Sequence, residues 1–358
     1  MKPGADMLSD TSPAAPGRLR PEAFIEHELL GELRVPGYAD VLEAAGRIRE
    51  HVQRTPLVRS ARLDAIAGGT VWLKAENLQV TGSFKIRGAF NAMLCLPPEQ
   101  RARGVVAYST GNHGQAIAWA ARRLGVPATI VMPVDAPRVK VEKALSQGAR
   151  VEHYDRRTQS REVIGMRLLA ETGGTLIPPG DDTAVIAGQA TVALEALADL
   201  PDAARDRLEW MAAPCGGGGL IAGCGLVFDV LSPGTRLVAV EPESFDDTVR
   251  SLASGKRESN PPGAAGLCDA LQAPTPAELP FEINRHFLAR AVSVSDEEVM
   301  AAMNFALDEL HLLVEPGGAV ALAALLCGRV ALDGGHALAV LSGGNVDRAV
   351  LQRCWAQA

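Results

Sequence analysis

The sequence lacks the features that would place the chain in a membrane or in an oxidising compartment. No apolar run approaches the roughly 20 residues that a bilayer-spanning helix requires. The six cysteines form no CxxC pair and the seven histidines show no ligand spacing, so neither a disulfide framework nor a zinc site is predicted. The N-terminal stretch contains acidic residues and prolines and has no apolar core like that of a signal peptide. A cytoplasmic location is therefore expected.

The chain also lacks an excess of positive charge. Its net charge is −7, from 35 Lys and Arg against 42 Asp and Glu, so a nucleic acid or an anionic membrane has no electrostatic attraction to it. Hydrophobic residues make up 47% and charged residues 22%, which is ordinary for a soluble globular enzyme. With 358 residues the chain is long enough for two domains. These properties favour an enzyme that acts on a small molecule.

Strand-like and helix-like stretches alternate along most of the chain. Past a Pro-Pro pair at 97–98, short apolar strands such as residues 104–108 and 128–132 are each followed by a helical pattern that ends at a glycine. Such alternation predicts an α/β fold, in which a parallel sheet has helices on both faces. The stretch up to about residue 35 is rich in Pro, Gly and charge and is expected to be a tail, with one short helix over residues 24–33.

One stretch, Thr81-Gly82-Ser83-Phe84-Lys85, combines a helix start with a lysine. Thr81, Gly82 and Ser83 have the chemistry of a helix N-terminus, which places Lys85 in the first turn, where the helix dipole disfavours a cation. Beside apolar residues, this lysine is expected to lose its charge more easily than a surface lysine and to become a nucleophile able to form a Schiff base. Taken alone, a solvated lysine whose stem covers apolar surface is the more common interpretation.

Three further turns are small and polar, and each follows a predicted strand. Residues 109–114 offer backbone N–H groups at a helix start, which suit a carboxylate. Residues 216–219 are four glycines, which let the backbone approach a phosphate without a side-chain clash. Ser342 begins the third turn, Ser-Gly-Gly-Asn. Each turn in isolation is typical of an ordinary structural turn, but together with Lys85 they predict one site for a phosphorylated aldehyde cofactor and an amino acid.

In these motifs the sequence resembles the tryptophan-synthase-β-like (fold type II) pyridoxal-phosphate enzymes, and within them the threonine and serine dehydratases and the serine racemases. The matching stretches occur in the family's order, at residues 81–89, 109–116, 185–189, 216–220, 315–319 and 342–345. The resemblance implies two open, twisted, mainly parallel sheets flanked by helices, in a large and a small domain. We expect the tail at 1–35, the large cofactor-binding domain at 36–103 and 182–358, and the small domain at 104–181. A homodimer or homotetramer is also expected.

The resemblance implies roles for individual residues. Lys85 and Thr110 are the expected catalytic residues, and Thr110 stands where serine racemases carry a serine that protonates the opposite face of Cα. Asn112 is expected to meet the 3′-oxygen of the ring and Ser342 its nitrogen. The full set of expected cofactor-binding residues is Phe84, Lys85, Asn112, Gly216, Gly217, Gly218, Gly219, Glu315 and Ser342. The expected substrate-binding residues are Ser109, Thr110, Gly111, His113 and Arg161.

The implied reaction is β-elimination, in which a β-hydroxy amino acid such as L-threonine or L-serine loses water, and the resulting aminoacrylate or aminocrotonate is hydrolysed by water to a 2-oxo acid and ammonia. A neutral hydroxyl at Ser342 does not keep the ring nitrogen protonated as an aspartate would, and this favours elimination over transamination. A serine racemase and a hydroxyaspartate or aryl-serine dehydratase are alternatives on the same fold. A nucleotide-binding Rossmann protein is a third interpretation, disfavoured because residues 216–219 are not a GxGxxG fingerprint.

An acidic segment at residues 241–247 resembles the divalent-cation site of serine racemases. There Glu241, the carbonyl of Phe245 and Asp247 are expected to supply the hard oxygen ligands that Mg²⁺, Mn²⁺ or Ca²⁺ prefers. A solvated acidic loop is an equally good interpretation of the same residues.

Overall fold

Two parallel sheets form the framework of the protein. The computed structural model describes residues 23–109, 111–136, 138–155 and 157–356. The larger sheet has, in spatial order, β11 (Leu288–Val294), β10 (Arg236–Pro242), β9 (Leu208–Pro214), β12 (His336–Leu341), β4 (Thr70–Ala75) and β3 (Leu57–Val58). All its neighbours are parallel except β3, which pairs antiparallel with β4. The smaller sheet is parallel throughout, in the order β7 (Arg150–Tyr154), β6 (Ala128–Pro133), β5 (Val105–Tyr108) and β8 (Thr175–Leu176).

Helices cover both faces of the larger sheet, which explains why its central strands are apolar almost without interruption. One face packs against α2 (Ala61–Ala67), α13 (Asp296–Leu310) and α14 (Pro316–Leu326). The other packs against α1 (Tyr38–Ile48), α8 (Thr183–Asp199), α10 (Gly219–Leu231) and α12 (Glu278–Phe287). In β12 every residue after His336 is buried, as a strand covered on both sides requires.

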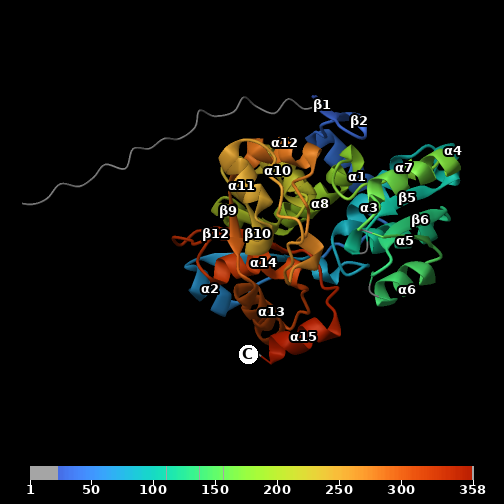
Figure 1. Cartoon of the computed structure of the whole chain (residues 1–358). Helices are drawn as coiled ribbons and strands as arrows, with labels where there is room; N and C mark the ends of the chain where they lie inside the picture. The colour runs from blue at the N-terminus through green and yellow to red at the C-terminus, as the bar shows by residue number, and fades with distance from the viewer. Residues whose placement is uncertain (1–22, 110, 137, 156, 357–358) are drawn as a thin grey trace, which may run out of the picture.

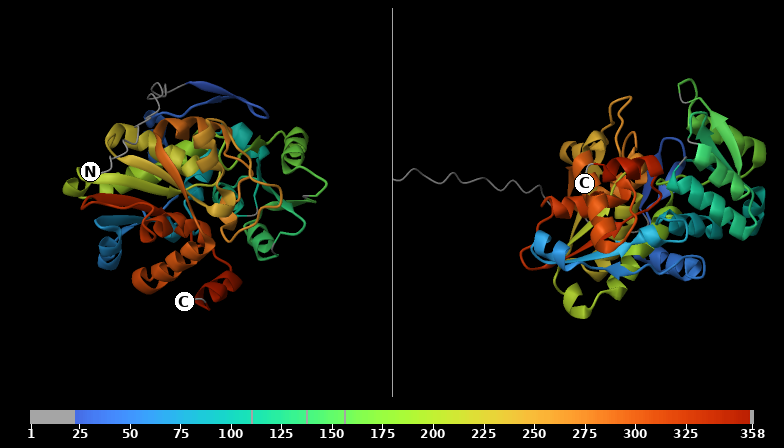
Figure 2. Two further views of the ribbon diagram at one scale, coloured as in Figure 1. Left: turned by 60° about the vertical axis from the view of Figure 1, so that its left-hand side comes forward. Right: turned by 90° about the horizontal axis from the view of Figure 1, so that it is seen from below.

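The smaller sheet is covered in the same way. Its one face packs against α3 (Lys85–Cys95), α5 (Asn112–Leu124) and α6 (Arg138–Ser146), and its other face against α7 (Arg161–Thr172). Figures 1 and 2 show these green and teal elements beside the larger sheet. The remaining helices are α4 (Pro98–Arg103), α9 (Asp202–Arg205), α11 (Asp247–Ser254) and α15 (Arg348–Trp355). No helix among the described residues is long and apolar enough to cross a membrane.

The start of the described chain differs from the expected short helix. Residues 24–33 belong instead to an antiparallel hairpin of β1 (Phe24–His27) and β2 (Gly31–Arg34), joined by a turn whose Gly31 has φ +72°. Along β1 exposed and half-buried residues alternate, which is the two-residue period of a strand. The prediction of a helix was wrong because so short an apolar run does not distinguish the two periods.

The strand order brings the motif turns together. In parallel sheets the carboxyl ends of the strands lie at one edge, and ligands bind beyond that edge. The glycine turn follows β9, Ser342 follows β12 and Ser109 follows β5. All four strands of the smaller sheet lie between residues 105 and 176, inside the range expected for the small domain. The domain boundaries themselves stay a prediction.

Candidate active site

Lys85 is the first residue of α3, and its amine meets a carbonyl rather than an acid. Nζ donates a hydrogen bond to the carbonyl of Pro179 at 2.9 Å and lies 5.1 Å from the centroid of the Phe84 ring. Burial lowers the pKa of Lys85 from its usual 10.5 to about 8, because the charged amine loses its hydration and no anion among the described residues compensates for that loss. A lysine that loses its charge more easily than a surface lysine was expected from the sequence, and this lowered pKa agrees with that expectation. The amine is therefore poised to act as a nucleophile or base.

The start of α3 is held by the turn that follows strand β12 and not by the expected cap. The N-cap residue is Phe84, which has no capping side chain, and the buried hydroxyl of Ser83 has no hydrogen-bond partner among the described residues. Instead, the amide of Phe84 donates to the carbonyl of Ser342 at 3.1 Å, and Ser83 forms an antiparallel bridge with Gly343. This pairing brings the start of α3 next to Ser342, which is only 5% exposed.

The glycine turn lies next to the same carbonyl that Lys85 contacts. A Cβ added at Gly219 would lie 3.9 Å from the oxygen of Pro179. Gly218 has φ +90°, which L side chains rarely adopt. In the described part of the chain, the amides of Gly216, Gly217 and Gly218 donate no hydrogen bond. Free N–H groups at the positive end of the 13-residue helix α10 fit a phosphate, and Lys85 lies within reach of the same group.

Asn112 and Glu315 join the two sheet regions. Asn112 begins α5 and donates from Nδ2 to Oε1 of Glu315 at 2.6 Å. Glu315 precedes α14 and is 3% exposed. Burial is the main cause that raises the pKa of Glu315 to about 7, while the hydrogen bond from Asn112 acts in the opposite direction. A carboxyl that titrates near neutral pH can take up or give back a proton during turnover.

The predicted carboxylate cradle follows β5. Ser109 accepts a hydrogen bond on Oγ from the amide of Gly111 at 3.2 Å, and Thr110 lies outside the described residues. His113 is buried, and its Nε2 lies 2.8 Å from the carbonyl of Ile177. Burial and the nearby Lys85 lower the pKa of His113 to about 3, so that its ring is neutral. Its buried Nδ1 has no partner among the described residues.

Arg161 is placed beside this cradle. As the first residue of α7 it packs its guanidinium 5.1 Å from the centroid of Tyr108, the residue before Ser109, and pairs with Glu162 at 2.7 Å. A guanidinium held over an aromatic ring next to the turn can donate hydrogen bonds to a carboxylate of a bound substrate.

The acidic segment does not form a ready metal site. Both carboxylate oxygens of Glu241 accept backbone amides, from Thr248 at 3.1 Å and from Val249 at 3.0 Å. The described residues contain no cluster of three or more His, Cys, Asp or Glu side chains that could hold a metal. Asp247 is fully buried, and its Oδ2 is the one oxygen of this carboxylate without a partner among the described residues.

Several residues that complete the site were not singled out from the sequence. Pro179 supplies the carbonyl that Lys85 contacts, Asn345 bonds to Asn112, and Lys140 of α6 pairs with Asp269 at 2.6 Å across the two sheet regions. Asn345 lay within a motif stretch, whereas Pro179 and Lys140 act through contacts with residues distant in the sequence. Only Asn345 therefore offered a signal that sequence inspection could have used.

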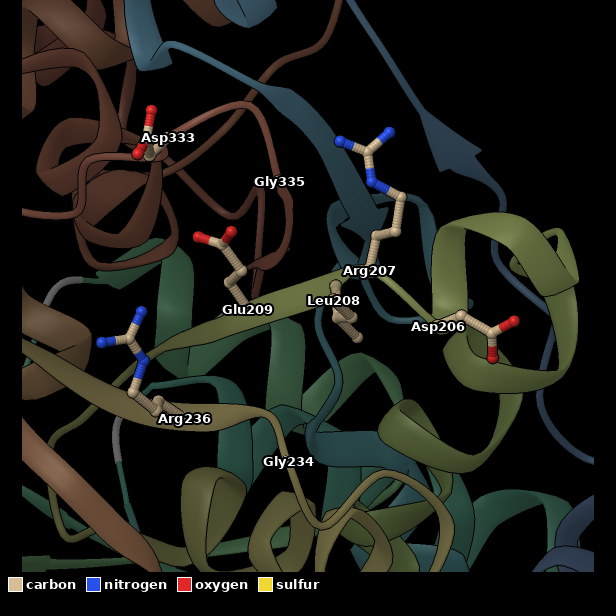
Figure 3. A pocket seen from close by; sticks show the side chains of 8 residues that line it. All are labelled: Asp206, Arg207, Leu208, Glu209, Gly234, Arg236, Asp333 and Gly335. Carbon is tan, nitrogen blue, oxygen red and sulfur yellow. The ribbon is translucent and has the colours of Figure 1, made fainter.

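A separate cavity of about 450 Å³ opens at the opposite, amino-terminal end of the strands (Figure 3). Its lining mixes both signs of charge and comes from Asp206, Arg207, Leu208, Glu209, Gly234, Arg236, Asp333 and Gly335. None of the predicted site residues lines it. The chemistry therefore belongs to the carboxyl edge, where the turns converge.

Comparison with known proteins agrees with this geometry. The model of the family "Pyridoxal-phosphate dependent enzyme" matches residues 48–343. The chain is 42% identical over 314 residues to the L-threo-3-hydroxyaspartate ammonia-lyase of Saccharomyces cerevisiae, covering 87% of this chain and 94% of that protein. It is 38% identical over 314 residues to the L-threonine ammonia-lyase of Thermotoga maritima, covering 88% and 77%.

Among solved structures, maize serine racemase superposes with a TM-score of 0.83 at 35% identity, covering 90% of this chain and 97% of that chain. The superposition confirms the fold class expected from the sequence. The relatives from Saccharomyces cerevisiae and Thermotoga maritima are named ammonia-lyases, the enzyme class that was expected. With the free amides of the glycine turn beside a lysine of lowered pKa, the matched region identifies the chain as a member of the pyridoxal-phosphate-dependent enzyme family, fold type II.

Proposed function

We propose that the enzyme removes water from a β-hydroxy amino acid, and that the released enamine takes up water again as it hydrolyses to a 2-oxo acid and ammonia. The observation that carries the proposal is the amine of Lys85, which has a pKa lowered to about 8 and lies beside the glycine turn. Among the described residues, its hydrogen-bond partner is the carbonyl of Pro179 and not an acid. An amine with a lowered pKa and no carboxylate beside it can both form a covalent bond to a carbonyl compound and remove a proton.

The residues divide the work by their positions. When bound, pyridoxal phosphate supplies an electron sink that stabilises negative charge on the α-carbon of the amino acid. The amides of residues 216–218 would hold its phosphate, and Asn112 and Ser342 its ring. The turn that starts at Ser109 would hold the substrate α-carboxylate, and Lys85 Nζ would remove the α-proton. The neutral ring of His113 would leave the turn without a competing charge.

For the substrate we propose a hydroxyaspartate in preference to threonine or serine. The support is twofold: the relative at 42% identity carries that activity in its name, and Arg161 offers a cation next to the carboxylate cradle. A second carboxylate on the substrate can pair with a guanidinium, whereas the methyl group of threonine cannot. Threonine is the second candidate, favoured by the relative from Thermotoga maritima.

The test is to assay threo-3-hydroxyaspartate, threonine and serine side by side for 2-oxo acid release, with Lys85→Ala as the inactive reference. We expect hydroxyaspartate to have the highest kcat/KM. Arg161→Met should lower kcat/KM for hydroxyaspartate by about 10- to 100-fold, the effect of a lost charged hydrogen bond, and lower that for serine much less.

Arg167→Met is the matched control, because Arg167 lies on the same helix and pairs with Glu152 away from the turn. Equal losses for hydroxyaspartate and serine in Arg161→Met would remove Arg161 from the substrate's second carboxylate. Threonine as the best substrate would overturn the choice of hydroxyaspartate while leaving the elimination reaction in place.

A divalent cation at the segment 241–247 is a separate proposal. The buried Oδ2 of Asp247, which has no partner among the described residues, supports this proposal. To bind the cation, Glu241 would have to give up one of the hydrogen bonds that it accepts from the amides of Thr248 and Val249. Chelation should then lower the Tm of the wild-type protein and leave that of Asp247→Asn unchanged. The same wild-type Tm in chelator and in excess Mg²⁺ would remove the proposal. No step of the reaction is assigned to the cation.

A further inference from the structure

The side-chain amide of Asn345 connects the lysine segment to Asn112. Its Nδ2 donates one hydrogen bond to the backbone carbonyl of Thr81 and a second to Oδ1 of Asn112, both at 2.9 Å. Thr81 lies four residues before Lys85, Asn112 begins α5, and Asn345 follows β12. Three elements that the sequence places far apart therefore meet at one amide group.

The polarity of this connection is determined by a single group. A backbone carbonyl only accepts hydrogen bonds, so the nitrogen of the Asn345 amide, and not its oxygen, must face Thr81. That nitrogen carries two hydrogens, and the second is directed to Asn112. Asn112 must then present its oxygen to Asn345, which leaves its own Nδ2 to donate on the other side, where Glu315 accepts it at 2.6 Å. A flipped Asn112 amide would set nitrogen against nitrogen and oxygen against oxygen.

Gly82 makes room for this arrangement. A Cβ added at Gly82 would lie 2.8 Å from Oδ1 of Asn345, and Gly82 has φ +73°. The amide of Gly344 also donates to the carbonyl of Gly82 at 2.8 Å, which holds the two turns together. The backbone of Thr81 and Gly82 therefore fixes the position of Asn345, and Asn345 can in turn fix the orientation of the Asn112 side chain.

We propose that Asn345 is a positioning residue that fixes the orientation of the Asn112 amide, so that Asn112 presents an N–H donor to the cofactor ring. The proposal rests on the proposed function, in which Asn112 holds the ring. Without Asn345 the Asn112 amide is held by Glu315 alone, and a protonated Glu315 can donate to the oxygen of that amide as readily as a carboxylate accepts from its nitrogen. The amide can then turn over and present its oxygen to the oxygen of the ring, where two acceptors repel. Asn345 itself does not need to touch the cofactor.

The test measures the dissociation constant of pyridoxal phosphate and the absorbance maximum of the bound cofactor in a double-mutant cycle. Asn345→Ala in the wild-type background should weaken binding about ten-fold, the worth of one hydrogen bond, and shift the absorbance maximum. Asn345→Asp, of nearly the same shape, should weaken it further, because a carboxylate offers no donor to either partner. In the Asn112→Ala background either change at residue 345 should alter binding by less than about two-fold.

Asn304→Ala is the matched control, since Asn304 also donates its amide to a backbone carbonyl, that of Cys354, away from the site. It should change neither quantity. Melting of each apoenzyme shows whether a variant is folded, and Asn345→Asp carries the test if Asn345→Ala is not. Additive losses for residues 345 and 112 would overturn the proposal, because Asn345 would then act through Thr81 alone. No loss of binding in Asn112→Ala would instead overturn the assignment of Asn112 to the cofactor, and the inference with it.

Discussion

Two polar clusters lie on different sides of the first turn of α3, and they differ in how completely their groups are paired. Arg87 donates to Glu76 and to Glu195 at 2.7–2.8 Å from several of its nitrogens, and Lys74 reaches Glu195 at 2.9 Å and the carbonyl of Thr55 at 2.7 Å. We call these residues the Arg87 cluster. The side chains of Arg87, Glu76 and Lys74 are 0% exposed.

The site around Lys85 is the opposite case. Lys85 has one carbonyl as its partner, and the buried Nδ1 of His113 and Oγ of Ser83 have none among the described residues. Residues 85 and 87 are only two positions apart, so they point about 200° apart around the helix axis. One side of a single helical turn is therefore saturated with hydrogen bonds and the other is left open.

The difference teaches how to separate structural from functional polar groups. A buried charge without partners costs several kcal/mol, so a fold keeps one only where a ligand or a reaction uses it. The Arg87 cluster joins β4, the short 3-10 helix Glu76–Leu78, α3 and α8. Every side-chain nitrogen and carboxylate oxygen of Arg87, Glu76, Glu195 and Lys74 has a partner among the described residues, so none is left for a ligand. The open groups around Lys85 are those that a bound molecule can satisfy.

Breaking the saturated cluster should produce the largest effect on stability. Arg87→Met leaves Glu76 buried without its cation, and we expect the free energy of unfolding to fall by about 3–5 kcal/mol. Urea denaturation followed by circular dichroism measures the change. Arg161→Met is the control, because Arg161 is half-buried, pairs with its neighbour Glu162 and packs on the ring of Tyr108 outside the Arg87 cluster. An unchanged midpoint for Arg87→Met would show that the cluster is not a structural centre.

Removing the amine from the open site should instead stabilise the apoenzyme near pH 7. The pKa of Lys85 is about 8 in the folded protein and near 10.5 when unfolded, so the folded state binds fewer protons between these values and gains stability as the pH rises. Below about pH 8 the wild-type protein bears the cost of a buried charged amine, and Lys85→Met does not. The Tm of Lys85→Met minus that of the wild type should be positive at pH 7 and shrink towards pH 10.

The exposed Lys143, changed to Met, is the matched control for this measurement, and its Tm difference should stay flat. A difference for Lys85→Met that is independent of pH would mean that the amine is not strained by burial in the folded state.

The ion pair of Lys140 and Asp269 is more exposed than the Arg87 cluster, and it tests whether exposure determines the strength of such pairs. Lys140 is 12% exposed, but its partner Asp269 is 52% exposed, so water screens the ion pair between the two sheet regions. Lys140→Met should lower the free energy of unfolding by about 0.2–1 kcal/mol. Lys74→Met, in the Arg87 cluster, is the matched comparison and should cost clearly more in the same urea titration. Equal costs would show that partner exposure does not decide the strength of these pairs.

The smallest expected effect concerns the ring of His113, which should not change its protonation state near neutral pH. Burial lowers the pKa of His113 to about 3, so its ring should stay neutral from pH 5 to pH 9. Nitrogen-15 chemical shifts of the histidine rings report the state directly, with the exposed His311 as internal reference in the same spectra. A transition of the His113 signal within this range would mean that its Nδ1 is open to water.

Most of the framework could be predicted because its signals are local. Alternating strands and glycine-ended helices predicted the parallel sheets, and the turns at Lys85, residues 216–219 and Ser342 were recognised from a few adjacent residues each. The cap at Ser83 could not be judged in the same way. Its hydroxyl was available for capping, but the bridge to Gly343, 260 positions away in the chain (343 − 83), set the backbone there instead.

The sequence by itself determined which groups are available at the carboxyl ends of the strands, since each motif is a strand followed within a few residues by its turn and helix. Only the tertiary structure decided which of those groups are satisfied. The Lys85 amine faces Pro179, 94 positions away, and Asn112 faces Asn345, 233 positions away. Hydrogen-bond partnership and burial depend on such distant contacts, and they set the pKa of Lys85 and the orientation of Asn112.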